Sequence, residues 1–161
     1  MSIVIANRQR AEKINARLLT KIVDALFAEL KIAEAELGIS LVGAKVMAKV
    51  NWDFLRHEGS TDVITFGYAK PEARRPKTEL KLHGELFVCV DEAILQAKNF
   101  KTSWQSEIVR YIVHGILHLL GHDDSKPHLR CKMKREENRL VRRLAQRFTL
   151  AELSRTAKIS A

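Results

Sequence analysis

The sequence has few cysteines and no long hydrophobic run, and each absence excludes a class of protein. Cys89 and Cys131 are the two cysteines among 161 residues. They form no Cys-x-x-Cys pair, so a disulfide scaffold is not expected. No apolar run approaches the roughly 18 residues that a transmembrane helix needs. The apolar stretch within residues 1–8 is too short for the core of a signal peptide. We therefore expect a cytoplasmic protein with no membrane partner.

Internal repeats and low-complexity segments are also absent. The spacings of helix-turn-helix and zinc-finger modules do not occur either, so no DNA partner is expected. With 46% hydrophobic and 29% charged residues, the chain has the composition of one globular domain. We expect this domain to span residues 1–150. Residues 151–161 carry weak signals for regular structure and are expected to form a C-terminal tail.

Positive charge is abundant and unevenly distributed. The chain has 28 Lys and Arg against 19 Asp and Glu, a formal net charge of +9. Residues 126–147 hold nine basic residues, opposed by Glu136 and Glu137 alone, so this segment carries +7. Such a concentration favours a polyanionic partner. A helix with one solvated charged face is the alternative interpretation.

The pattern of apolar residues predicts an α+β fold, with one mixed sheet of about four strands packed with helices. The fourth strand is almost entirely apolar and is therefore expected at the centre of the sheet. A helix that starts at residue 91 is expected to be capped by Asp91. The predicted strands are residues 2–6, 39–42, 62–67 and 85–90. The predicted helices are residues 11–33, 44–54, 91–100, 102–121 and a last one from about 124, and a loop is predicted for 69–82.

Two histidines in the fourth helix predict a metal site. Residues 112–124 read Ile-Val-His-Gly-Ile-Leu-His-Leu-Leu-Gly-His-Asp-Asp. His114 and His118 are four residues apart, so they lie on one helix face, roughly 6 Å apart along the axis. Two imidazoles so placed can bind one Zn²⁺. The surrounding residues are apolar, which predicts a metal site on a buried helix, and Gly115 is expected to leave open space beside the metal.

A third ligand is expected after the helix. Gly121 lets the chain reverse, and His122, Asp123 and Asp124 follow it. All three residues can bind zinc through their side chains. Three protein ligands would leave the fourth position of a tetrahedral site to water, as in catalytic zinc sites.

The same segment carries a family resemblance. It resembles the signature of the YbeY family of bacterial endoribonucleases, His-Gly-x-Leu-His-Leu-x-Gly-(Tyr or His)-Asp-His, at every specified position except the last. Residues 50–54, 60–66 and 84–89 are similar to three further family motifs and follow in the family order. The resemblance covers about residues 40–145. It implies a zinc-dependent endoribonuclease that prefers single strands, matures ribosomal RNA (especially the small-subunit 3′ end) and supports ribosome quality control. The implied partners are ribosomal RNA and the small ribosomal subunit.

Two departures from the family pattern concern the site. The last signature position is a histidine in the family and Asp124 here. A carboxylate also binds zinc, and Asp124 keeps the family's ten-residue spacing from His114, so we prefer it to His122. The expected centre is one Zn²⁺ per chain on His114, His118 and Asp124. Family members often carry Arg directly after the aromatic residue of residues 50–54. Here Leu55 holds that position, and Arg56 is the candidate catalytic residue, as a phosphate clamp; a solvated turn arginine is the alternative.

Two rival functions can be stated. Metallopeptidases of this layout use His-Glu-x-x-His with Glu as the general base, and Gly115 stands where that Glu would be. A non-catalytic RNA-binding ribosome assembly factor with a structural metal would be favoured by a closed site, in which both His122 and Asp124 bind the ion. For RNA binding, the basic last helix and the Lys70–Lys81 loop are the candidates for phosphate contacts.

Overall fold

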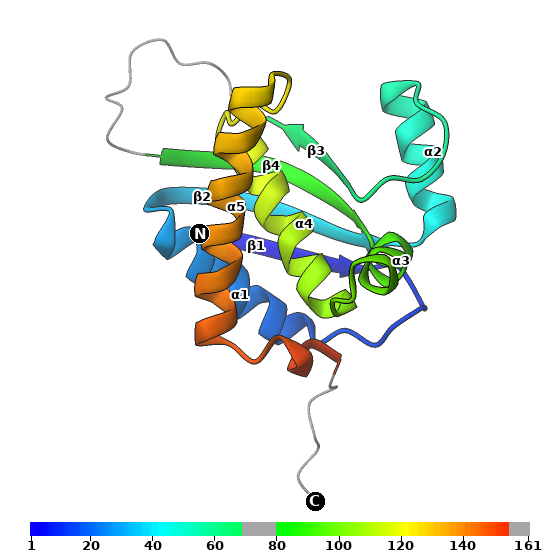
Figure 1. Cartoon of the computed structure of the whole chain (residues 1–161), viewed down its shortest axis with the longest axis horizontal. Coiled ribbons are helices and arrows are strands. Elements are labelled where there is room, and N and C mark those ends of the chain that lie inside the picture. Colours follow the sequence, from blue (N-terminus) through cyan, green and yellow to red (C-terminus); the bar gives the residue numbers. More distant parts are fainter. Residues whose placement is uncertain (69–79, 155–161) are drawn as a thin grey trace, which may run out of the picture.

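A computed structural model describes residues 1–68 and 80–154 of the chain (Figure 1). The described residues form four strands, five α-helices and a terminal 3₁₀ helix. The strands are β1 (Ser2–Asn7), β2 (Ile32–Val42), β3 (Val63–Gly67) and β4 (Leu80–Cys89). The helices are α1 (Ala16–Glu29), α2 (Ala44–Leu55), α3 (Val90–Phe100), α4 (Trp104–Leu119), α5 (Pro127–Arg147) and the 3₁₀ helix Leu150–Ser154.

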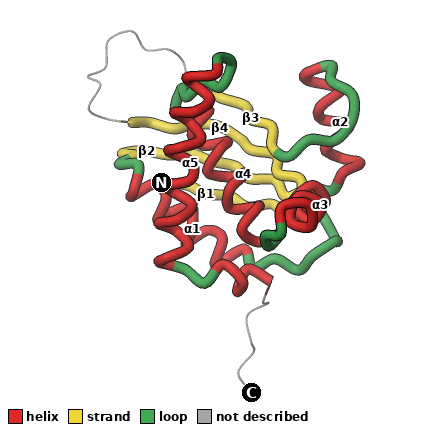
Figure 2. Tube along the Cα trace, viewed as in Figure 1, coloured by secondary structure: helices red, strands yellow, loops and turns green. Residues whose placement is uncertain are grey.

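The strands form one mixed sheet in the order β1-β2-β4-β3 (Figure 2). β2 pairs in parallel with both β1 and β4, while β3 runs antiparallel to β4. The predicted α+β class and four-stranded mixed sheet are confirmed. β4 lies between β2 and β3, so the apolar strand is internal, as its composition predicted.

Helices cover the two faces of the sheet unequally. α1 and α4 pack on one face, and α5 lies across them on the outside (Figure 1). The main core fills this layer; it includes Leu86 of β4 and Ile112 of α4. Ile64 of β3 alternates to the opposite face and packs with Met47 of α2 in a second, smaller core. Helix α4 is therefore held between the sheet and α5, and the burial predicted for it is confirmed.

The largest difference from the sequence prediction lies at residues 11–33. The predicted helix is shorter, because α1 starts at Ala16 after the N-cap Asn15, and β2 already starts at Ile32. Residues 32–37 are rich in Ala and Glu, which favour helices. Their side chains nevertheless alternate between buried and exposed positions along most of the segment, and the backbone pairs with β4. Pairing within the sheet outweighs the weak local preference.

Asp91 caps a different helix from the one predicted. The N-cap position of α3 is Cys89, so Asp91 lies inside the first turn. Its carboxylate instead accepts a hydrogen bond of 2.6 Å from the backbone N–H of Ala44, the first residue of α2. The N-cap of α2 is Gly43, which has no side chain to do this. Asp91 therefore satisfies a free donor of its neighbour helix.

Two predicted segments extend beyond the described residues. Residues 80–82, predicted as loop, belong to β4, while the rest of that loop from residue 69 to 79 lies outside the described residues. The same holds for residues 155–161 of the predicted tail. Leu153, just before them, is fully buried in the main core. Both cysteines are free, as predicted, and no helix of the described part has the length and apolarity to cross a membrane.

Candidate metal centre

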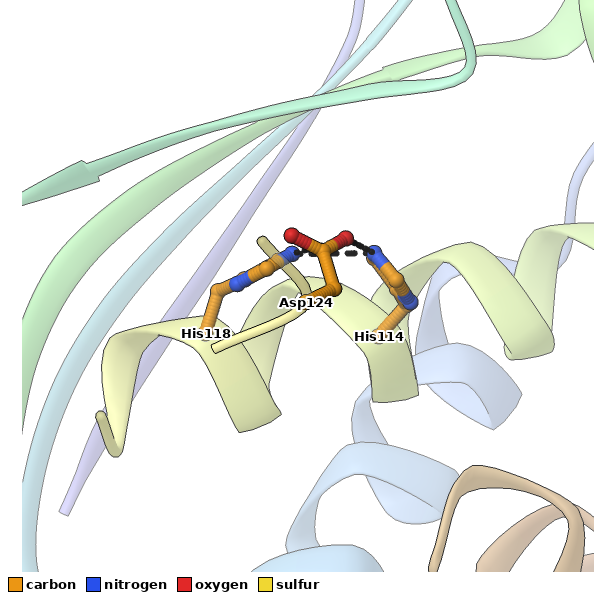
Figure 3. A group of neighbouring side chains, drawn as sticks. All are labelled: His114, His118 and Asp124. Atoms are coloured by element: carbon orange, nitrogen blue, oxygen red, sulfur yellow. Dashed lines mark hydrogen bonds and ion pairs between the residues drawn. The ribbon is translucent and has the colours of Figure 1, made fainter. Parts of the chain in front are cut away.

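Three of the predicted site residues converge on one point. His114 and His118 project from α4, and Asp124 lies over them from the segment between α4 and α5 (Figure 3). One ligand atom from each lies within 4.8 Å of the other two. The imidazole side chains are 29% and 27% exposed, so the point between them is reachable from solvent.

The spacing of these atoms suits a small tetrahedral ion. The two Nε2 atoms of His114 and His118 are 3.0 Å apart. Oδ2 of Asp124 lies 3.8 Å from the first and 3.4 Å from the second. Zinc bound to nitrogen and oxygen at about 2.0–2.1 Å needs ligand atoms roughly 3.3–3.4 Å apart. The three distances bracket that value, so the side chains fit a zinc-sized ion, with a fourth position left to water or substrate.

Hydrogen bonds at the other ring nitrogen fix both imidazoles. Nδ1 of His114 contacts Oε1 of Glu137 at 2.8 Å, and Nδ1 of His118 contacts the carbonyl oxygen of His122 at 3.0 Å. Each acceptor holds a proton on Nδ1, so the lone pair of Nε2 points to the shared centre. Such acceptors orient metal-binding histidines and make them better ligands.

The turn after α4 places Asp124. Gly121 has φ +97°, a backbone conformation that suits glycine. The N–H of Gly121 donates to the carbonyl of His118, and the N–H of His122 donates to that of Leu117, which together form a Schellman motif. This turn aims the His122 carbonyl at His118 and brings Asp124 back over the helix. His122 thus contributes its carbonyl, and its side chain is not part of the three-residue group.

Glu137 supports the centre, a role that was not predicted from the sequence. Its side chain is 3% exposed and accepts hydrogen bonds from His114, Arg110 and Lys134. Burial alone would raise the pKa of Glu137, but these three donors outweigh it and lower the pKa to about 2. The signal was present in the sequence: Glu137 occupies an apolar-stripe position of α5, four residues after Met133, where a carboxylate needs a partner.

The same contact changes the proton affinity of His114. The hydrogen bond with Glu137 raises the pKa of His114, against the opposing effect of burial. Without a metal, the ring therefore holds a second proton more strongly than an ordinary histidine does. A metal must displace that proton, so its binding at this centre is coupled to pH.

Gly115 does not provide the open space that was expected beside the metal. A Cβ atom at this position would lie 2.8 Å from Cδ2 of Leu86 and 3.3 Å from Cγ2 of Thr65. The residue therefore faces the sheet, about 100° around the helix from His114. The absence of a side chain lets α4 approach β3 and β4 closely. Space at the centre comes instead from a cavity on another side of α4.

That cavity has a volume of about 640 Å³ and borders two of the three candidate ligand residues, His114 and Asp124. Residues from α3, α4, α5 and the segment before β3 form its walls. Arg56 is not among them. It has φ +54° at the C-terminal end of α2, and its guanidinium lies 5.5 Å from the ring centre of Trp52.

The basic charge of α5 is partly neutralised by neighbouring carboxylates. Arg139 pairs with Glu136 within the helix, and Arg143 pairs with Glu29 of α1. Lys132, Arg135 and Arg142 are exposed and have no acidic partner within the described residues. One outer surface of α5 therefore carries uncompensated positive charge.

The chain is similar to known proteins in both sequence and fold. The family model described as Endoribonuclease YbeY matches residues 4–145. Endoribonuclease YbeY of Chlorobium phaeovibrioides is 36% identical over 100 residues, which cover 62% of this chain and 62% of that protein, less than two thirds of its length. Endoribonuclease YbeY of Chlorobaculum tepidum is 30% identical over 131 residues, or 81% of this chain and 90% of that protein. The solution structure of a Thermotoga maritima protein has the same fold, with a TM-score of 0.66 at 20% identity and 99% coverage of both chains.

Proposed function

The chain belongs to the YbeY endoribonuclease family, and on this premise we propose that it is a zinc-dependent endoribonuclease with its centre at His114, His118 and Asp124. The observation that carries the proposal is the convergence of these three ligand atoms at the edge of a cavity. Two imidazoles and one carboxylate suit zinc among the common metals. One ion per chain is proposed, because the described residues contain one such group.

A bound zinc ion would act as a Lewis acid on a phosphoryl oxygen or lower the pKa of a bound water. The chain's own residues prepare the site for this chemistry. Glu137 and the His122 carbonyl keep both Nε2 atoms directed at one point. Arg130 donates a hydrogen bond of 3.2 Å to the carbonyl of Asp124 and so ties the ligand segment to α5.

The proposed substrate is single-stranded ribosomal RNA, with the 3′ end of the small-subunit RNA and ribosome quality control as the setting. The net charge of +9 and the unpaired basic residues of α5 support an RNA partner. We further propose cytoplasmic action on the small ribosomal subunit. Phosphate contacts are assigned to α5 and to Arg56, which is exposed at the end of α2. Most of the Lys70–Lys81 loop lies outside the described residues, so its part in the RNA path stays a prediction.

The geometry disfavours the metallopeptidase alternative. The residue after the first metal-binding histidine would have to supply the general base. At Gly115 that position faces Leu86 and Thr65 of the sheet, away from the centre. The assembly-factor alternative needs a closed centre, with His122 as a fourth protein ligand. The three-residue group leaves that position open.

A cleavage assay with metal removal and restoration tests the proposal. The purified protein should cut single-stranded RNA internally, lose this activity on chelation and regain it with about one equivalent of zinc. The double variant His114→Ala, His118→Ala should be inactive and metal-free. His128→Ala, which changes an exposed histidine outside the group, is the matched control and should behave like the native protein. Undiminished cleavage by the double variant would refute the assignment.

A further inference from the structure

The cavity beside the metal centre has two ends of opposite charge. At the metal end, Arg130 contacts the Asp124 carbonyl, while Arg110 and Lys134 contact Glu137. The other end contains two carboxylates, Glu92 in α3 and Glu107 in α4, while Asp62, before β3, is near enough to act on both His114 and Tyr111. A phosphate of a bound RNA suits the first end, and the second end would repel it.

Tyr111, which also lines the cavity, feels the charge of all three carboxylates. Desolvation raises the pKa of Tyr111, and the negative charges of Glu107, Asp62 and Glu92 raise it further. The hydroxyl itself donates a hydrogen bond to the carbonyl of Glu92. The three acidic residues therefore share one cavity with Tyr111.

These carboxylates have no basic partner within the described residues, in contrast to Glu137. Asp62 accepts from the Val63 N–H and the Thr61 hydroxyl, and Glu92 accepts from Gln96. Glu107 is 6% exposed, and its Oε1 accepts from the Thr102 hydroxyl at 2.6 Å. A buried carboxylate beside a cavity, held by neutral groups alone, can accept further hydrogen bonds from a ligand with N–H groups.

The separation of the two ends matches one nucleotide. Glu107 and His114 lie two turns apart on the same face of α4, roughly 10 Å along the helix axis. A phosphate at His114 would thus place its attached base near Glu107. The volume of about 640 Å³ falls within the range of small-ligand pockets. Phe100 and Met133 supply apolar wall for the flat faces of a base.

We propose that this cavity binds a guanine base next to the phosphodiester bond at the metal centre. This inference rests on the proposed endoribonuclease function and adds a base preference to it. Guanine presents N1–H and its 2-amino group side by side, which match the two oxygens of one carboxylate. Adenine and cytosine place a ring acceptor beside their amino group, and uracil flanks its N–H with two carbonyls. Each of these three bases would place a hydrogen-bond acceptor opposite a carboxylate oxygen, which is also an acceptor.

Calorimetric titration of the full-length, zinc-loaded protein with two mononucleotides tests the pocket. The probes are guanosine 5′-monophosphate (GMP) and inosine 5′-monophosphate (IMP), which differ only by the 2-amino group. GMP should bind at least about fivefold more tightly, the low end of the discrimination by a bidentate base contact. Glu107→Gln and the less buried Glu92→Gln should each shrink this ratio. Glu29→Gln, which removes a carboxylate paired with Arg143 outside the cavity, should leave it unchanged.

Equal affinities for GMP and IMP, or no binding of either nucleotide, would refute the proposed guanine pocket. A ratio that survives in both Glu107→Gln and Glu92→Gln, each checked for native thermal unfolding, would also overturn it. RNA cleavage is assayed on the same samples, because binding of a mononucleotide does not require cleavage. RNA cleavage by a protein that binds GMP and IMP equally would refute the guanine pocket and leave the proposed endoribonuclease function intact. Selective GMP binding without cleavage supports the pocket and removes the proposed function.

Discussion

The carboxylate of Glu137 on α5 accepts a 2.8 Å hydrogen bond from Nδ1 of His114 on α4. This contact joins the candidate metal centre to the basic helix. The same carboxylate also accepts hydrogen bonds from Arg110 and Lys134. One buried acid therefore holds the candidate metal-binding residue His114 and two basic side chains in place. The position of α5 and the orientation of the first ligand are therefore set together.

Glu137→Gln should weaken zinc binding. The amide keeps an acceptor near Nδ1 but removes the negative charge that makes the imidazole a stronger ligand. Loss of such a partner costs about 10–100-fold in metal affinity. Competition with a chromogenic chelator measures the change. Glu136→Gln, one residue away and paired with Arg139, is the control and should retain native affinity.

The stability of the metal-free protein should depend on Glu137 at acid pH. The folded state lowers the pKa of Glu137 from 4.5 to about 2. A lowered pKa stabilises the folded state above the ordinary pKa, and this contribution is lost as the pH falls from about 4.5 to 2. Urea denaturation at several pH values should show a smaller decline in the free energy of unfolding for Glu137→Gln. Parallel declines in the two proteins would contradict the assignment.

Removal of the third ligand should distinguish Asp124 from His122. Asp124→Ala should lower zinc content, because it removes a carboxylate oxygen from the three-residue group. His122→Ala should keep zinc, since its backbone carbonyl, and not its ring, contacts His118. Asp124→His should keep or tighten binding, because imidazole suits zinc. Metal analysis of the dialysed proteins provides the measurement. The opposite ranking of the two alanine variants would make the assignment wrong.

Two pairs of arginines on α5 offer matched tests of RNA contact. Arg135→Gln with Arg142→Gln removes two charges that have no acidic partner in the described chain. Arg139→Gln with Arg143→Gln removes two that are paired with Glu136 and Glu29. The first pair should lower the slope of log affinity against log salt by about 0.7 for each lost single-strand contact.

The second pair should change that slope less, because its charges are already compensated. Zinc content should stay native in both. If neither pair changes affinity or slope, α5 is a solvated surface, and the RNA path belongs elsewhere.

Gly115→Ala should destabilise the protein without emptying the centre. Alanine favours the helix by about 1 kcal/mol, but its Cβ would meet Leu86 at 2.8 Å within the core. Overpacking of this kind costs about 1–3 kcal/mol. The loss in free energy of unfolding should shrink in a Leu86→Ala background, because the coupling is between these two residues. Equal losses in both backgrounds would contradict the proposed clash.

Local sequence patterns predicted the parts of the site that are local in the chain. His114 and His118 at helical spacing, and a turn at Gly121, predicted a third ligand among residues 122–124, and the family resemblance selected Asp124 from these. Glu137 was missed because its contact depends on how α5 packs on α4. The sequence places the Glu137 carboxylate on the apolar face of its helix, but the pattern of residues does not show which side chain it contacts.

The errors in the fold have the same origin. Residues 32–37 are rich in helix-favouring Ala and Glu, and their pairing with β4 depends on a strand more than 40 residues away. Asp91 was predicted to cap its own helix, α3. Its carboxylate instead accepts a hydrogen bond from the backbone N–H of Ala44 in α2. Gly115 was placed correctly in the helix, but the direction of the missing side chain depended on where the sheet lies.

The Schellman motif at Gly121 has a consequence for how the centre assembles. The three candidate ligand residues lie within residues 114–124, and the turn brings them together by closing only a short loop. The parallel pairings of β1, β2 and β4 join distant segments and form slowly by comparison. The three residues therefore converge through contacts that are local in the chain, without help from the sheet.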